Sequence, residues 1–225
     1  MIANLKKSLK LIKYGYKFEY NIAISAVVLV VVVILYTLTF VLSANLFILN
    51  FILLYVAIGL PSQIREDLLH SQILASSGFR RFFDINFGDV YAFISGIIAY
   101  LIHGGLILLF YKEGAFKGET LTTLLVSAGF CIGAMTISFA LINKTFGAGL
   151  FMYFLVGFCN GFCSAVIEDL EASGLLDLNR GSAFAVGIGL VVVSALISMW
   201  ARRLVYKRPY SRFSTSGELQ KAMQA

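Results

Sequence analysis

Residues 21–42 read NIAISAVVLVVVVILYTLTFVL and contain no charged side chain. A transmembrane helix needs about 20 mostly apolar residues to cross roughly 30 Å of hydrocarbon, and this stretch is long enough. The valine-rich run 27–33 would favour a strand in water, but in lipid the backbone must satisfy its own hydrogen bonds, so a helix is expected. The stretch is also too long for the apolar core of a signal peptide and no suitable cleavage site follows it, which predicts an uncleaved span.

Similar apolar stretches recur along the chain. They cover residues 44–60, 89–111, 120–141, 146–167 and 182–204. The sequence therefore predicts an all-α polytopic membrane protein with six transmembrane helices within 21–204, preceded by a segment 1–20 and followed by a basic tail 205–225.

The composition excludes several other classes of protein. The 225 residues are 59% hydrophobic and 13% charged, with a mean hydropathy of +0.87. A soluble domain carries about twice that share of charge, and a disordered chain needs low hydrophobicity. Three cysteines make no disulfide framework.

The lysines and arginines predict the orientation. Five precede the first span, three lie in 61–88, one in 142–145 and six at the C-terminal end, whereas the loops on the other side hold only Lys112, Lys117 and Arg180. Positive residues concentrate on the cytoplasmic side, so both termini are expected in the cytoplasm and the protein in the cytoplasmic membrane. The net charge of +6 then reflects topology and anionic lipid rather than nucleic acid binding.

The segment before the first span has helical periodicity. Its apolar residues share one face of a helix: Ile2, Leu5, Leu9, Ile12 and Tyr16. This pattern is typical of an amphipathic helix at the cytoplasmic membrane surface. Such a helix can be a simple topology anchor or can also dock a partner.

The cytoplasmic stretch 61–88 is the longest hydrophilic segment between spans, and a long structured loop is usually functional. A break at 76–78 is followed by a mixed aromatic and basic cluster. The residues singled out here are Ser76, Gly78, Phe79, Arg80, Arg81 and Phe82. The cluster can lie at the membrane surface with its arginines among the headgroups, or it can contact a cytoplasmic protein.

The outer loop 168–181 alternates acidic residues with leucines, which predicts a short amphipathic segment at the outer surface. The calcium-loop pattern is absent from it. A solvated acidic face is the simpler interpretation.

No charged residue lies deep in any predicted span, which argues against a proton pump or a voltage sensor. Catalytic motifs and a phosphate-binding loop are also absent, so the chain is not expected to be an enzyme, and any ATP would be hydrolysed by another chain. Three polar residues lie within spans: Asn50, His103 and Asn160. They can form hydrogen bonds between helices or line a substrate path.

Two spans carry G-x-x-x-G, with Gly129 and Gly133 in one and Gly157 and Gly161 in the other. Small residues one turn apart allow helices to approach closely. The contact can lie within the monomer or at a subunit interface.

The order of these parts resembles the six-helix permease subunit of ABC-2-type ABC exporters, and residues 9–16 (LKLIKYGY) look like small permeases of Gram-positive bacteria. The resemblance implies a connecting helix at 2–16, a coupling helix within 71–83 between spans two and three, and an outer cap at 167–178. It also implies a second permease subunit, either identical or homologous, and separate ATPase subunits that bind ATP and Mg²⁺. No cofactor is expected in this chain.

The function expected from this resemblance is export of an amphipathic peptide or lipid-like substrate, driven by the ATPase. The alternative is the substrate-capture subunit of an energy-coupling-factor vitamin importer, which is also a small chain with six spans. An unenergised scramblase or assembly factor is a third hypothesis.

Overall fold

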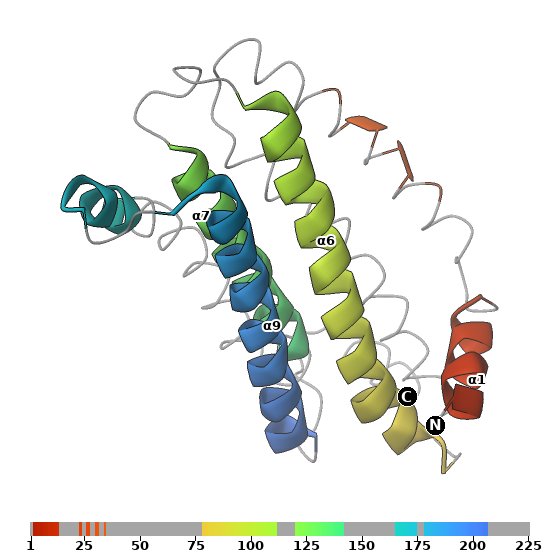
Figure 1. Ribbon diagram of the computed structural model, residues 1–225. Helices are drawn as coiled ribbons and strands as arrows, with labels where there is room; N and C mark the ends of the chain where they lie inside the picture. The colour runs from red at the N-terminus through yellow and green to blue at the C-terminus, as the bar shows by residue number, and fades with distance from the viewer. Residues whose placement is uncertain are drawn as a thin grey trace, which may run out of the picture.

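The computed structural model describes residues 2–13, 78–111, 120–141, 165–174 and 178–206, together with positions 23, 26, 27, 30, 31 and 34. The regular structure in these ranges is helical (Figure 1). It comprises α1 (Ile2–Lys13), η2 (Phe82–Phe87), α6 (Gly88–Phe110), α7 (Leu121–Leu141), α9 (Arg180–Val205) and a short helix at 165–172. The all-helical class is thereby confirmed for the described part of the chain.

Three of these helices are long and apolar enough to cross a membrane: Phe82–Leu109, Leu121–Ser138 and Arg180–Val205. They coincide with the third, fourth and sixth predicted spans. The predicted spans at 21–42, 44–60 and 146–167 and the tail 205–225 lie almost wholly outside the described residues. The described helices suggest a membrane-embedded protein.

The first of the three helices begins earlier than the sequence predicted. The apolar stretch was expected to start at residue 89, but the helical path already starts at Arg80 and passes through the π-helix η2 directly into α6. A π-helix holds more residues per turn than an α-helix and often occurs at functional sites. Arg80, Arg81 and Phe82 of the cluster therefore belong to the start of this helical path, whereas Gly78 and Phe79 lie in the turn before it.

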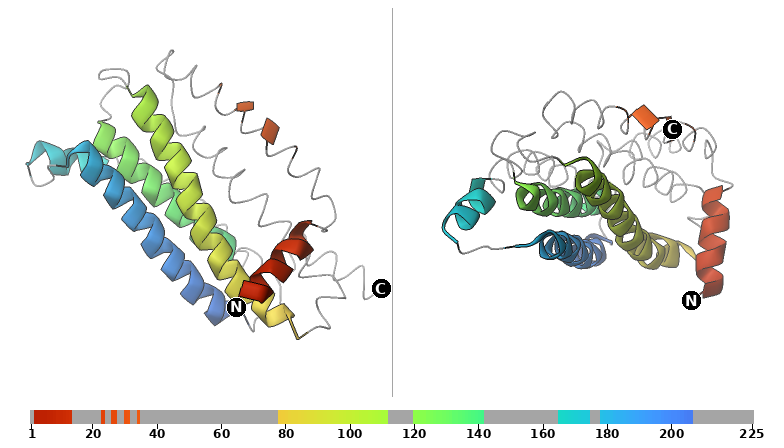
Figure 2. Two further views of the ribbon diagram at one scale, coloured as in Figure 1. Left: turned by 45° about the vertical axis from the view of Figure 1, so that its right-hand side comes forward. Right: turned by 45° about the horizontal axis from the view of Figure 1, so that its top comes forward.

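The long helices α6, α7 and α9 pack on one another as a bundle (Figures 1 and 2). Helix α7 is the most buried of the three, whereas α9 leaves most of its apolar length exposed. The outer faces of α6 and α9 instead expose large aliphatic side chains: Ile94, Ile98, Leu101, Val193, Leu196 and Ile197. Such faces suit contact with lipid or with another apolar helix.

Small residues bring α7 and α9 together. A Cβ atom added at Gly129 would lie 2.6 Å from the carbonyl oxygen of Gly187, and one at Gly133 would overlap Ser194. The first G-x-x-x-G motif therefore packs within the chain, which decides between the two alternatives for it. The second motif, at Gly157 and Gly161, lies outside the described residues.

Tyr100 connects the three helices at the centre of the bundle. Its side chain is fully buried on α6, and its hydroxyl lies 3.2 Å from both the Leu125 carbonyl oxygen on α7 and the Phe184 carbonyl oxygen on α9. The single hydroxyl proton is shared between these two acceptors in an apolar interior, where an unsatisfied polar group would be costly. One side chain thus fixes the relative positions of all three helices.

Candidate functional site

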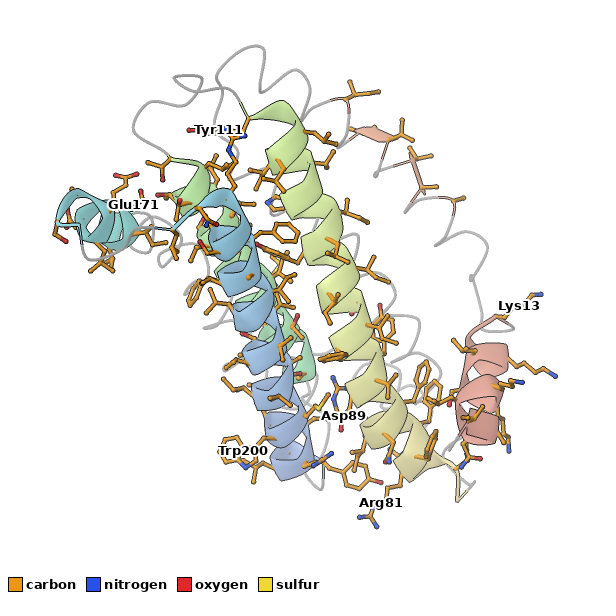
Figure 3. The ribbon with its side chains drawn as sticks, in the orientation of Figure 1. Lys13, Arg81, Asp89, Tyr111, Glu171 and Trp200 are labelled. Carbon is orange, nitrogen blue, oxygen red and sulfur yellow. The ribbon has the colours of Figure 1, made fainter. Side chains whose placement is uncertain are left out.

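The two ends of the bundle carry opposite charge. One end holds α1, η2 and the last turn of α9, and its exposed charged residues in the described chain are all basic: Lys6, Lys7, Lys10, Lys13, Arg81 and Arg203. The other end holds the helix 165–172 with Glu168, Asp169 and Glu171. Figure 3 shows Arg81, Asp89 and Trp200 near the first end and Tyr111 and Glu171 near the second. They are called the basic end and the acidic end below.

A row of aromatic rings runs along one face of η2 and into α6. This aromatic ladder consists of Phe79, Phe83, Phe87 and Tyr91, with ring centroids 6.5, 5.2 and 6.4 Å apart in that order. Each spacing falls in the range that aromatic pairs prefer, at about 0.5–1.5 kcal/mol per pair beyond the area buried. Phe83 and Phe87 are buried, so the ladder stiffens the segment as it enters the bundle.

Helix α1 docks on this ladder. Leu5 and Leu11 pack against the cluster around Phe83 and Phe87, and the Lys7 ammonium lies 4.7 Å from the centroid of the Phe79 ring. That distance is within the range of a cation–π interaction. In the right-hand view of Figure 2, α1 lies across the basic end of α6.

The residues of the predicted apolar face of α1 do not all pack against the bundle. Leu5 turns toward the aromatic ladder, whereas Ile2 and Leu9 are exposed. Ser8, which the periodicity did not assign to the apolar face, is fully buried, and its hydroxyl donates to the Asn4 carbonyl 3.0 Å away. The helix therefore has one face on the protein and apolar side chains on another.

A charge cluster joins the other side of the same segment to α9. Asp89, in the first turn of α6, has one carboxylate oxygen 3.6 Å from Arg202 Nε and the other 3.2 Å from an Arg203 terminal nitrogen. The Asp89 and Arg202 side chains are 7% and 8% exposed, and that of Arg203 is 64% exposed. The guanidinium groups at the C-terminus of α9 are also favoured by the dipole of that helix.

These contacts connect α1, η2, the start of α6 and the end of α9 across the basic end. Segment η2 contacts α1 on one side and α9 on the other. The aromatic ladder makes the first contact and the adjoining Asp89, Arg202 and Arg203 provide the ionic link to α9. Displacement of the Phe/Arg segment would therefore act on both the N-terminal helix and the last span.

The structure places the residues singled out from the sequence as follows. Gly78 lies in an exposed turn, Phe79 and Phe82 stack at a centroid distance of 5.4 Å, Arg80 is half-buried and Arg81 is exposed. His103 is buried in α6, well along the helix from this group. Ser76, Asn50, Gly157, Asn160 and Gly161 lie outside the described residues.

Sequence reasoning missed the partnership of Asp89 with Arg202 and Arg203. It counted the two arginines only as orientation signals and treated residue 89 as the start of a span. The available signal was the expected topology, which puts the start of span three and the end of span six on the same membrane side. Asp89 at the start of span three is therefore a candidate ion-pair partner for Arg202 or Arg203 at the end of span six.

The acidic end is closed by the helix 165–172. Its Glu171 carboxylate accepts a hydrogen bond of 2.8 Å from the Thr120 hydroxyl, which precedes α7. The chain then turns at Gly174, whose φ of 71° favours glycine. Asn179 caps the start of α9, and its side chain accepts a hydrogen bond of 2.8 Å from the Ser182 N–H. No group of three or more metal-ligating side chains occurs within the described ranges.

Comparison of the chain with protein-family models, with curated proteins and with solved structures finds no match.

Proposed function

We propose that this chain is the permease subunit of an ATP-driven exporter of the ABC-2 type, located in the cytoplasmic membrane with both termini in the cytoplasm. A separate ATPase subunit, which binds ATP and Mg²⁺, drives it. The observation that carries the proposal is the packing of α1, the aromatic ladder and the end of α9 into one connected group at the basic end. A transport subunit without an ATP-binding motif needs such a group to receive movement from a partner.

The exposed part of this group defines the docking surface for the ATPase. Phe79, Arg80 and Arg81 precede η2 at the basic end, and Arg81 is exposed. Closure of two ATPase subunits displaces this surface. The aromatic ladder passes the displacement to α1, and Asp89 passes it to α9 through its two arginines.

The nature of the spans suggests the class of cargo. Helix α7 contains no charged residue, and the charged residues of α6 and α9 lie in their first or last turns. An apolar wall of this kind suits an amphipathic peptide or a lipid-like compound better than an ion, since ion and proton paths use charged groups within the membrane. A second permease subunit, identical or homologous, completes the path.

The test is purification of the tagged full-length chain in mild detergent from membranes of the cells that encode it. Mg²⁺-dependent ATP hydrolysis should elute with the wild-type chain. It should be largely lost when Arg80→Glu and Arg81→Glu are combined, because the charge reversal changes the docking surface. The matched control is Arg180→Glu, an exposed arginine at the acidic end, which should keep the hydrolysis.

Two outcomes contradict the proposal. One is an eluate without ATP hydrolysis in the wild type, and the other is equal hydrolysis in the wild type and in the doubly reversed variant. Thermal stabilisation of the purified chain by a water-soluble vitamin would instead favour the vitamin importer.

A further inference from the structure

The last three turns of α9 present a strip of apolar, aromatic and cationic side chains. Leu196, Trp200, Arg203 and Leu204 are all exposed, and their spacing of 4, 3 and 1 residues puts them on one side of the helix. This strip lies at the basic end, and Figure 3 shows Trp200 at the end of the helix. It is separate from the face of α9 that packs on α7, where Gly187, Val191, Ala195 and Ser198 are buried.

Arg203 is held in place but remains available. Asp89 accepts a hydrogen bond from it at 3.2 Å, which restricts the guanidinium, yet 64% of the side chain is exposed. The same carboxylate also faces Arg202, so these three side chains together carry a net positive charge. An arginine has five N–H donors, and the bond to Asp89 leaves others for a second acceptor.

Trp200 marks the depth of this strip in a membrane. Its side chain is 65% exposed, and tryptophan is enriched where the hydrocarbon meets the headgroups. Arg203 lies one turn nearer the end of the helix, at headgroup level, while Leu196 lies one turn deeper. The order from headgroup to hydrocarbon is therefore cation, aromatic ring, aliphatic side chain.

The surrounding charge favours an anionic ligand. At the basic end, the acidic residues of the described chain are Asp84 and Asp89, and both are buried. The exposed acidic residue Asp169 lies at the opposite end. Nothing exposed in the described part of this end would repel a phosphate group.

We propose that this strip binds an anionic phospholipid. The phosphate accepts hydrogen bonds from the Arg203 guanidinium, the indole of Trp200 lies beside the glycerol region, and an acyl chain runs along Leu196 toward Val193. Asp89 orients Arg203 for this contact. The site requires that the protein is embedded in a membrane and does not depend on the proposed transport.

The chain supplies its own probe, because Trp200 is the only tryptophan in the sequence. The full-length protein is reconstituted in phosphatidylcholine vesicles that contain, at equal mole fraction, either brominated phosphatidylcholine or brominated phosphatidylglycerol. The bromine sits near the carboxyl end of one acyl chain and quenches a neighbouring indole. One arginine near a membrane surface is worth a roughly fivefold preference for anionic lipid, so the brominated phosphatidylglycerol should quench Trp200 more strongly.

Two variants separate this site from general attraction by the basic end. Arg203→Gln should bring the quenching by the two brominated lipids to the same level, whereas Arg81→Gln should leave the difference in place. Inorganic phosphate at the same ionic strength should not abolish the difference, since the acyl chain is part of the ligand.

Equal quenching of wild-type Trp200 by the two lipids would overturn the proposal. So would a difference that persists in Arg203→Gln, because the attraction would then come from other cations. Loss of the difference on addition of inorganic phosphate would overturn it as well, since the site would then recognise free phosphate.

Discussion

Asp89 and Arg202 face each other where the start of α6 meets the end of α9, with 3.6 Å between the carboxylate oxygen and Nε and both side chains less than one tenth exposed. The pair is supplemented by Arg203, whose terminal nitrogen reaches the second carboxylate oxygen at 3.2 Å. Helices α6 and α9, which are far apart in the sequence, are thereby joined by an ionic interaction at the basic end.

Asp89→Ala should therefore destabilise the protein strongly. Removal of one partner leaves the Arg202 guanidinium buried without its carboxylate, which costs about 3–5 kcal/mol. Arg203→Ala should cost about 1 kcal/mol or less, because its side chain is mostly exposed. Thermal unfolding in detergent, followed by the fluorescence of Trp200, measures both.

The matched control for this prediction is Asp169→Ala, which removes an exposed carboxylate at the acidic end. It should leave the unfolding temperature almost unchanged. If Asp89→Ala behaves like Asp169→Ala, the ionic link does not hold α6 to α9.

Gly187→Ala should also destabilise the bundle. A Cβ atom at this position would overlap the hydroxyl and ring of the buried Tyr100, and Tyr100 in turn binds carbonyl groups of α7 and α9. Overpacking of this kind costs about 1–3 kcal/mol. Gly189→Ala, two residues further along the same helix, meets no atom within 4 Å and should stay within about 1 kcal/mol of the wild type.

A double-mutant cycle identifies the atom responsible. The Tyr100 hydroxyl is the nearest atom to the added methyl group, so Gly187→Ala should cost less in a Tyr100→Phe background than in the wild type. Equal costs in the two backgrounds would show that the ring of residue 100, and not the Tyr100 hydroxyl, limits this position.

The three helices of the bundle could be predicted from the sequence, but the contacts between them could not. Length and apolarity predicted the helices now seen as α6, α7 and α9, because in lipid those two properties alone require a helix. The predicted start at residue 89 agrees with the start of α6 at Gly88, but the helical path before it was not assigned to the span, since Phe82 and Phe83 stand among charged residues. Phe83 is buried in a cluster that includes Leu5 and Leu11 of α1, a segment about 70 residues away, and periodicity within one helix carries no information about that contact.

The same limit applies to α1. Periodicity gave Leu5 and Leu9 the same role, but the structure packs Leu5 on the aromatic ladder and exposes Leu9. A helical wheel ranks residues by hydrophobicity and cannot tell a face toward protein from a face toward lipid. That distinction needs the position of the neighbouring helix.

Phe83→Ala should release α1 from the bundle. Phe83 is fully buried between its neighbours in the ladder, and truncation of such a ring costs about 3–5 kcal/mol. Hydrogen exchange of the α1 amides, measured by mass spectrometry, should accelerate while α7 remains protected. Leu9→Ala, which shortens an exposed side chain on α1, serves as the control and should leave the exchange unchanged. Unaltered α1 exchange in Phe83→Ala would mean that the ladder does not hold this helix.

The opposite charges of the two ends predict the orientation of the protein, and labelling of single cysteines measures it. Lys13→Cys on α1 and Ser173→Cys in the turn after the helix 165–172 are both at exposed positions. They are introduced separately after the three native cysteines have been replaced. Because positive residues stay in the cytoplasm, a membrane-impermeant maleimide added to intact cells should label Ser173→Cys but not Lys13→Cys, and permeabilised cells should show both. The reverse pattern would put the basic end outside, where no cytoplasmic ATPase could reach Phe79–Arg81, and would exclude the proposed exporter.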